Sequence, residues 1–262
     1  MKTHARAVII GGGAMGVGLL YHLAKEGWKD VVLVEKGELT SGSTWHAAGL
    51  IPHFIGSLNM AKIHFYGADL YKKLENETGQ ATGWHGCGAI RLAIDQDQVD
   101  WFHYVKGVLD QVGAECHLLG PDEIKKVHPL LETEGFLMGA YTTGDGHTDP
   151  SGATQAMAVG ARSNGAEIYL NNRVTDTNLL PSGEWEVITE KGKIICEHLV
   201  NAAGSFCEQV GMMVDIKIPM VNMVHQYLMT ETIPEVAALV NELPVVRDPR
   251  SSCYYRQEQS GL

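Results

Sequence analysis

The sequence lacks the features by which membrane, secreted and disulfide-bonded proteins are recognised. No apolar run reaches the roughly eighteen residues that a membrane-spanning helix needs, and no charged leader with an apolar core precedes the first predicted strand. The five cysteines are scattered and form no C-x-x-C pair, which excludes a disulfide framework and a thiolate zinc site. We therefore expect a soluble cytoplasmic protein, or a protein of the mitochondrial matrix if a eukaryotic presequence has been removed.

Positive charge is also scarce. The chain has 20 Lys and Arg residues against 31 Asp and Glu residues, a formal net charge of −11. This balance argues against nucleic acid or an acidic membrane as the main partner. His, Cys and acidic residues show no metal-ligand spacing, so no metal is predicted. The remaining composition, 45% hydrophobic and 19% charged residues, is ordinary for a globular α/β protein.

The first residues contain a complete β-α-β pattern. A β-branched run at 5–10 predicts a buried parallel strand, periodic leucines at 17–26 predict a helix, and DVVLVE at 30–35 predicts a second strand. The sequence GGGAMG at 11–16 connects the first strand to the helix. This is the context in which a G-x-G-x-x-G motif becomes evidence for a dinucleotide site.

Each glycine of the motif has a separate physical role. Gly11 permits the tight turn, Gly13 lets the backbone approach a pyrophosphate, and Gly16 allows the helix to pack closely on the strand. The helix N-terminus would stabilise the anion, and Glu35 would accept hydrogen bonds from ribose hydroxyls. The motif predicts a dinucleotide but does not by itself choose between NAD and FAD.

A loop-like segment of small residues, TSGSTWHAAGL, follows the second strand at 40–50. Its central histidine, His46, would face the reactive end of a bound cofactor and not its phosphates. Taken alone, a single histidine in a loop is more often a hydrogen-bonded structural residue. The choice between these interpretations depends on the surrounding sequence.

That surrounding sequence closely resembles the dimethylglycine and sarcosine dehydrogenase family of FAD-dependent oxidoreductases, within the glycine-oxidase and D-amino-acid-oxidase-like flavoenzymes. The likeness starts with residues 35–50 and continues in IHFYGADLYKKLENETG (63–79), GAIRLA (88–93), GDGHTDP (144–150) and VNAAG (200–204). It implies an α/β fold, in which a Rossmann-like FAD-binding domain carries an inserted, mainly antiparallel β substrate domain of α+β type.

The resemblance also implies that the two domains alternate along the chain. We expect the FAD-binding part at 1–80, a first substrate (cap) segment at 81–145, a return to the FAD-binding domain at 146–215 and a second substrate segment at 216–262.

The last segment is expected to be mostly β-strand from 217 to 256, with one helical stretch at 234–243. The family's late flavin-contacting segment and its C-terminal folate-binding domains do not occur before Leu262. We therefore expect a C-terminally incomplete fold, an N-terminal piece of a longer protein, and tetrahydrofolate as a ligand only if those domains exist.

The resemblance selects FAD as the cofactor and His46 as its covalent attachment point. In the family, the histidine of the W-H-A-A-G segment is bonded to the 8α-methyl group of FAD. The strand ending in A-A-G touches the nucleotide again, and a valine like Val174 packs on the adenine side. The implied cofactor-binding residues are Gly11, Gly13, Ala14, Met15, Gly16, Glu35, Lys36, Gly42, Ser43, Thr44, Trp45, His46, Ala47, Ala48, Gly49, Leu50, Val174 and Gly204.

The implied reaction is the oxidative demethylation of a small N-methylated glycine, dimethylglycine or sarcosine, by hydride transfer to the bound flavin. The implied catalytic residues are His225, Tyr254 and Tyr255. A histidine can keep the substrate amine neutral, and a tyrosine hydroxyl can hydrogen-bond the substrate. Strand alternation points one of the two tyrosines inward and the other outward, and the sequence leaves open which is which.

Several choices stay open at this point. Arg256 and Arg91 are both candidates for pairing with a substrate carboxylate. Asp145 and His147 have either a catalytic role or the role of stiffening a turn before a helix. The electrons would pass to an electron-transferring flavoprotein, or to oxygen in an oxidase.

Two other functions remain as alternatives. The first is an FAD enzyme that acts on another amine, a D-amino acid, a proline-like amine or a polyol phosphate. The second is a non-catalytic fragment or a flavin-dependent binding or tRNA-modifying partner.

Overall fold

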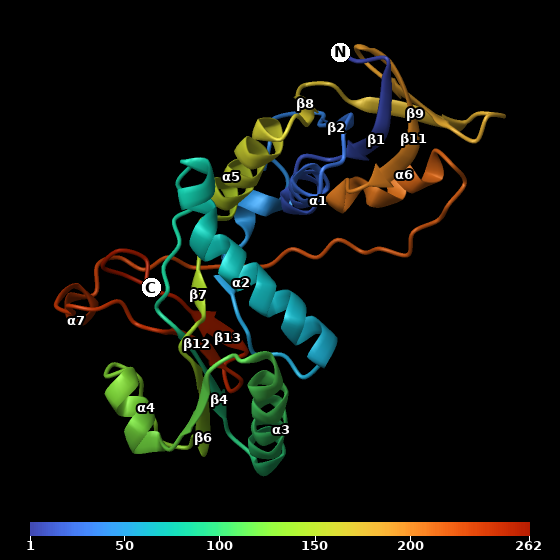
Figure 1. Cartoon of the computed structure of the whole chain (residues 1–262). Coiled ribbons are helices and arrows are strands. Elements are labelled where there is room, and N and C mark those ends of the chain that lie inside the picture. Colours follow the sequence, from blue (N-terminus) through green and yellow to red (C-terminus); the bar gives the residue numbers. More distant parts are fainter. The chain divides into compact units, whose positions relative to one another are not determined.

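The computed structural model describes residues 1–262, which form two compact units. Unit 1 contains residues 1–49, 73–83 and 149–224, and unit 2 contains residues 50–72, 84–148 and 225–262. The chain therefore passes between the units several times, as the colours of Figure 1 show. The predicted α/β class is confirmed, since both units combine helices with strands.

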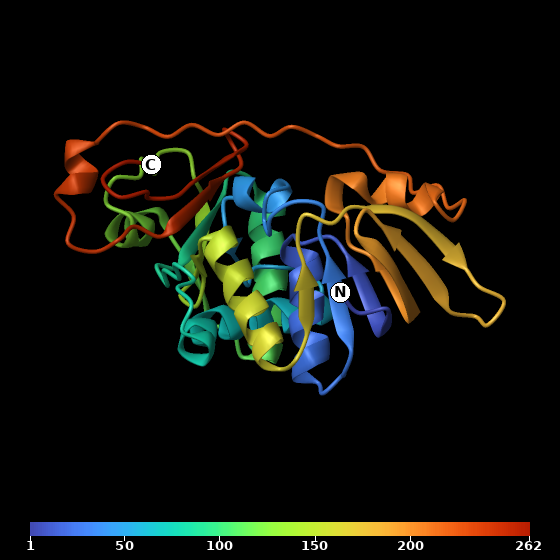
Figure 2. The same ribbon diagram turned by 90° about the horizontal axis from the view of Figure 1, so that it is seen from above.

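Unit 1 is built on a six-stranded sheet with the order β8-β2-β1-β11-β10-β9. The strands β1, β2, β8 and β11 run parallel to one another, while β9, β10 and β11 are antiparallel, and β9 forms the outer edge (Figure 2). The bounds are β1 His4–Ile10, β2 Val31–Val34, β8 Glu167–Tyr169, β9 Val174–Leu179, β10 Trp185–Thr189 and β11 Gly192–Asn201.

The parallel centre of this sheet follows from its residue types. All four residues of β2 are buried, as are the last four residues of β1, which is expected for β-branched strands covered on both faces. Two helices, α1 (Ala14–Lys25) and α5 (Pro150–Ser163), pack together, with the Tyr21 ring against Gly160. Asp149 caps α5 by accepting hydrogen bonds from the amides of Ser151 and Gly152, 3.0 Å each.

Unit 2 is built on a five-stranded sheet with the order β13-β12-β4-β6-β5 and on a small pair, β3 with β7. The bounds are β3 Leu50–Ile51, β4 Ala89–Ala93, β5 Cys116–Leu119, β6 Met138–Thr142, β7 Gly146–His147, β12 Val245–Asp248 and β13 Cys253–Tyr255. The helices are α3 Gln96–Val112, α4 Pro121–Val127 and α7 Pro234–Ala237. The long helix α2 (Leu58–Thr78) contributes residues to both units.

The two faces of the unit 2 sheet are covered by different helices. Ile90 and Val246 on one face belong to the same apolar cluster as Ile124 of α4. Ala93 on the other face packs with Phe54 and Phe102, and Phe102 lies on α3. Alternation along β4 therefore decides which side chains enter each layer.

The expected β-structure after residue 217 is largely wrong. Residues 217–233 are irregular, β12 and β13 are short, and the helix at 234 ends at Ala237 and not at Leu243 (Figure 2). The alternating apolar pattern of MVNMVHQYLM resembles a strand, but a strand also needs a hydrogen-bonding neighbour. No strand pairs with this segment, and Val221 and Val224 are 87% and 89% exposed.

The only strand at residues 83–93 is β4, which is preceded by an isolated bridge between His85 and His147. Residues 50–72 belong to unit 2, although we expected them in the FAD-binding part. The assignment of the units to cofactor and substrate stays a prediction. None of the helices combines the length and the apolar composition needed to cross a bilayer.

One buried histidine predicts how the stability of this fold depends on pH. His128 is 7% exposed, its Nδ1 has no hydrogen-bond partner, and burial lowers its pKa from the usual 6.5. The unfolded chain therefore takes up this proton first, and the contribution of neutral His128 is lost as the pH falls below 6.5. We expect His128→Leu to flatten the pH dependence of urea unfolding between pH 7.5 and 5.5, by at most about 1.4 kcal/mol per pH unit.

The control for this prediction is His117→Leu, because His117 is exposed. The free energy of unfolding of His117→Leu should depend on pH as that of the wild type does. If His128→Leu also showed the wild-type dependence, buried His128 would not be the cause of the loss of stability at low pH.

Candidate functional site

The turn between β1 and α1 has no room for side chains at two of its glycines. Gly11 has φ +117°, and a Cβ atom built on it would lie 2.3 Å from the carbonyl oxygen of Ala202. A Cβ on Gly16 would lie 1.9 Å from the carbonyl oxygen of Gly11. Gly13 caps the N-terminus of α1. The close packing at Gly11 and Gly16 brings the N-terminus of α1 against the end of β1, and a pyrophosphate at this helix end stays a prediction of the motif.

Glu35 is held at the end of β2 by two main-chain amides. The side chain is 9% exposed; its Oε2 accepts from the amide of Gly12 at 2.6 Å, and its Oε1 accepts from the amide of Gly37 at 2.8 Å. Each carboxylate oxygen retains a lone pair for a further hydrogen bond. Glu35 is therefore fixed in a position from which it can accept from ribose hydroxyls.

An open pocket lies beside this carboxylate. Four predicted residues, Gly11, Glu35, Lys36 and Val174, line it. Its other lining residues, which the sequence did not single out, are Ile10, Val34, Arg173, Ala203, Phe206, Gln209, Val210 and Met213. The apolar walls with one carboxylate and two cationic residues suit the adenosine end of a dinucleotide.

Phe206 and Arg173 in this pocket were missed for lack of a clear signal. Phe206 follows the predicted Gly204, and the ammonium of Lys36 lies 3.3 Å from the centroid of its ring. Arg173 directly precedes Val174 at the start of β9. Adjacency to predicted residues was the one signal available, and it does not specify which neighbours face the pocket.

The segment with His46 forms a single turn of 3-10 helix, η1 (Ser43–His46), and not an irregular loop. The Thr44 hydroxyl accepts from the amide of Ala14 at the start of α1, 3.0 Å away. The Ser43 and Ser205 hydroxyls are 3.2 Å apart. Helix α1 and η1 are thereby joined, so that the segment is anchored to the nucleotide-binding turn.

His46 itself is exposed. Its ring lies against that of Trp45, with 3.7 Å between the centroids, and its Nδ1 donates to the carbonyl of Gly42 at 3.3 Å. This hydrogen bond places the proton on Nδ1 and leaves the lone pair of Nε2 unengaged. The other predicted residues of the segment also lie at or near the surface. Leu50, the last of them, begins β3 and belongs to unit 2.

In unit 2, two arginines and a tyrosine form a row across three strands. Arg91 on β4 pairs in register with Arg247 on β12, which pairs with Tyr254 on β13. Tyr255 lies on the opposite face, in register with Val246, and its hydroxyl is 3.0 Å from that of Ser251. Both tyrosines are exposed, so the expectation that one of them points inward is wrong, and Tyr254 is the one that shares a face with the arginines.

The two arginines line an open, shallow pocket together with Phe54, Thr142 and Asp145. The Arg91 guanidinium lies 4.9 Å from the Phe54 ring centroid, and that of Arg247 lies 5.4 Å from the Tyr254 ring. Burial lowers the pKa of Arg91 to about 10, and Arg247 adds to the shift. Neither guanidinium has an ion pair or hydrogen bond within the chain.

The structure gives Asp145 an anchoring role. It is 1% exposed and accepts hydrogen bonds from the amide of His53 (2.8 Å), the Nδ1 of His53 (2.6 Å) and the hydroxyl of Thr142 (2.5 Å). These bonds tie the GDGHTDP turn to a segment far away in sequence. The turn is thus held by a local bond to Thr142 and by two long-range bonds to His53.

Two other sequence-predicted residues are not brought to this pocket. His225 lies exposed in the irregular segment, and no hydrogen bond or ring contact joins it to Tyr254 or Tyr255. Arg256 approaches the Nδ1 of His147 at 3.3 Å and forms an ion pair with Glu258. Arg91 is therefore the better placed of the two proposed carboxylate partners.

Comparison with known proteins agrees with this geometry. The model of the family "FAD dependent oxidoreductase" matches residues 6–262. The chain is 48% identical over 261 residues to human mitochondrial dimethylglycine dehydrogenase and 34% identical over 268 residues to human mitochondrial sarcosine dehydrogenase. These matches cover 100% of the chain but 30% and 29% of the two relatives.

Among solved structures, L-proline dehydrogenase from P. horikoshii is similar with a TM-score of 0.89 and 27% identity. That match covers 100% of this chain and 69% of the other. The resemblance predicted from residues 35–50 and the later segments is confirmed. The chain belongs to the FAD-dependent oxidoreductase family.

Proposed function

We propose that the protein containing this chain oxidatively demethylates a small N-methylated amino acid, dimethylglycine or sarcosine, with FAD as the cofactor. The observation that carries the proposal is the pair of arginines, Arg91 and Arg247, which line one pocket without an ion pair. The chain that holds this pocket is 48% identical to a dimethylglycine dehydrogenase. A substrate of this class has one carboxylate, which such a row would bind, and one amine at which the reaction occurs.

The residues of unit 1 fit FAD. The glycine turn places the N-terminus of α1 where its dipole would stabilise a pyrophosphate, Glu35 is positioned for ribose hydroxyls, and the pocket beside Val174 has apolar walls for adenine. When bound, FAD would accept the hydride removed from the N-methyl carbon. His46, with its Nε2 unengaged, is the residue proposed to hold the flavin covalently.

The residues of unit 2 would bind and orient the substrate. The carboxylate would form charge-assisted hydrogen bonds with Arg91 and Arg247, and the partial burial of Arg91 beside Phe54 would strengthen them. Tyr254 shares this face and would hydrogen-bond the substrate. His225 remains the proposed acceptor of the amine proton.

Further proposals concern the complete protein. The chain spans about 30% of the length of its dehydrogenase relatives, so a folate-binding part and an electron-transferring flavoprotein partner remain inferences from the resemblance. The mitochondrial designation of the relatives supports the same compartment for a eukaryotic source.

Anaerobic reduction of the flavin tests the proposed substrate. We expect dimethylglycine or sarcosine to bleach the flavin absorption of the complete protein, and dimethylethylamine, which lacks the carboxylate, to do so only at much higher concentration. Replacing Arg91 or Arg247 with Met should weaken substrate binding by roughly 10–100-fold, because each removes a charge-assisted hydrogen bond worth about 1.5–3 kcal/mol.

Arg250→Met is the matched control, since Arg250 also lies over an aromatic ring, that of Phe136, but does not line the pocket. Failure of both N-methylated glycines to reduce the flavin would contradict the proposal.

A second candidate is the oxidation of an unmethylated amino acid. The TM-score of 0.89 to an L-proline dehydrogenase favours it, and the arginine row would serve any amino-acid carboxylate. Adding proline to the substrate series separates the two: reduction by proline with no response to dimethylglycine or sarcosine would select this candidate.

A further inference from the structure

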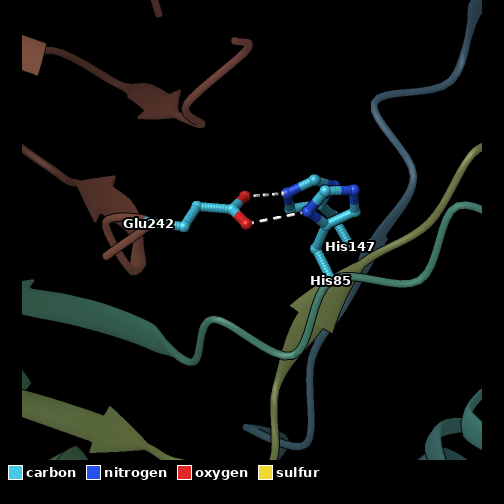
Figure 3. A group of neighbouring side chains, drawn as sticks. All are labelled: His85, His147 and Glu242. Carbon is cyan, nitrogen blue, oxygen red and sulfur yellow. Dashed lines mark hydrogen bonds and ion pairs between the residues drawn. The ribbon is translucent and has the colours of Figure 1, made fainter. Parts of the chain in front are cut away.

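Two histidines from distant segments face each other in unit 2. His85 and His147 form an isolated antiparallel bridge, with amide-to-carbonyl distances of 2.8 and 3.0 Å in the two directions. Their rings are stacked, 4.7 Å apart at 11°. The backbone thus fixes the two imidazoles side by side, as Figure 3 shows.

A glutamate from a third segment bridges the two rings. Glu242, which follows α7, places Oε2 2.8 Å from the Nδ1 of His85 and Oε1 2.6 Å from the Nε2 of His147 (Figure 3). The donor atoms of the three residues all lie within 4.8 Å of one another. The His147 side chain is 7% exposed, while those of His85 and Glu242 are 52% and 27% exposed, so one side of the cluster is open to solvent.

We propose that His85, His147 and Glu242 form a binding site for a divalent transition-metal ion of the Zn²⁺ type. Two imidazole nitrogens and one carboxylate oxygen are a donor set that such ions accept, with water completing the coordination on the open side. The nitrogen donors disfavour Mg²⁺ and Ca²⁺, which take oxygen ligands. This site is separate from the proposed FAD chemistry and does not depend on it.

A bound ion would require small shifts of all three side chains. Ligands about 2.0–2.2 Å from a tetrahedral ion lie roughly 3.3 Å apart, so Glu242 would move a few tenths of an ångström away from the two nitrogens, and the two rings, whose centroids are 4.7 Å apart, would tilt toward each other. The exposed side chain of His85 leaves room for that shift. The ion would take the place of the two N–H protons that Glu242 now accepts, and each imidazole would carry its proton on the other nitrogen.

Arg256 lowers the affinity of the site for the ion, because it favours the His147 tautomer that cannot bind a metal through Nε2. Its guanidinium donates to the Nδ1 of His147 at 3.3 Å, so the Nε2 carries the proton. A metal on Nε2 would place a proton on Nδ1 and displace this hydrogen bond, leaving Arg256 with Glu258.

A bound ion would tie the segment around Glu242 to the histidine bridge. That segment leads directly into β12, which carries Arg247. The ion would therefore hold the approach to β12 against β7, in the manner of a structural metal.

Titration of the complete protein with Zn²⁺ in competition with a chromophoric chelator tests the site. We expect one ion bound per chain through this cluster, and an affinity lowered by more than about tenfold in His85→Gln and in Glu242→Gln. Arg256→Gln should tighten binding, because the competing donor is removed. Co²⁺ in place of Zn²⁺ should produce visible absorption bands that disappear in His85→Gln.

His117→Gln is the matched control, since His117 pairs with a single carboxylate, Glu115, at 3.0 Å and has no second histidine. It should bind Zn²⁺ as the wild type does. Zn²⁺ affinity unchanged in both His85→Gln and Glu242→Gln, or no binding by the wild type, would overturn the proposal. His85 is exposed, so its variant should remain folded, and thermal unfolding measured alongside checks this.

Discussion

Replacing Gly16 with alanine is expected to abolish FAD binding by the complete protein. The new Cβ atom would lie 1.9 Å from the carbonyl oxygen of Gly11, which no side-chain rotation relieves. Gly11 has little room to move. A Cβ atom on it would already lie 2.3 Å from the carbonyl oxygen of Ala202, and its amide donates to the carbonyl of Val34 at 3.0 Å. The loss of stability should reach the upper end of the roughly 1–3 kcal/mol typical of overpacked sites.

The control for Gly16→Ala is Gly18→Ala on the same helix. A Cβ on Gly18 would lie 3.8 Å from the Sδ of Met157, an ordinary contact, so this variant should keep FAD and gain about 1 kcal/mol of helix stability. Flavin content after gel filtration and the thermal midpoint measure both effects. Retention of FAD and of the wild-type midpoint by Gly16→Ala would show that the turn relaxes and does not require glycine.

The nucleotide-binding part was predictable because its signals are local. The two β-branched runs, at 5–10 and 30–35, form the buried parallel strands β1 and β2. The predicted helix at 17–26 corresponds to α1 at 14–25. Strand, turn and helix follow one another within a few residues. Each position is therefore constrained by its immediate neighbours, and the pattern is legible without knowledge of the rest of the chain.

The candidate substrate site could not be derived in the same way. Arg91 and Arg247 become neighbours only because β4 and β12 pair in parallel across a long stretch of chain. The cluster of His85, His147 and Glu242 likewise comes from three separate segments, so that no ligand spacing exists in the sequence.

The segment with His225 shows the opposite failure. Its alternation fits a strand, but strand formation depends on a partner that a pattern cannot specify.

Replacing His46 with alanine is expected to remove covalently bound flavin completely. The wild-type protein should keep a fluorescent flavin band on a denaturing gel. His46→Ala should lose this band although the variant protein remains soluble and folded. His46 is exposed and contacts Gly42 and Trp45, so its removal leaves the apolar core intact. A loss of flavin fluorescence on the gel would therefore report the missing bond and not an unfolded protein.

The matched control is His198→Ala, a histidine of the same unit whose ring lies 5.6 Å from that of Trp28. This variant should keep the fluorescent band, because His198 is on β11 and outside both the glycine turn and η1. If His46→Ala kept the band as well, the attachment point would be another residue. If neither the wild type nor His198→Ala showed a band while both bound FAD in solution, the flavin would be held by the unit 1 pocket alone. His46 would then act through its place in η1, which Thr44 joins to the start of α1.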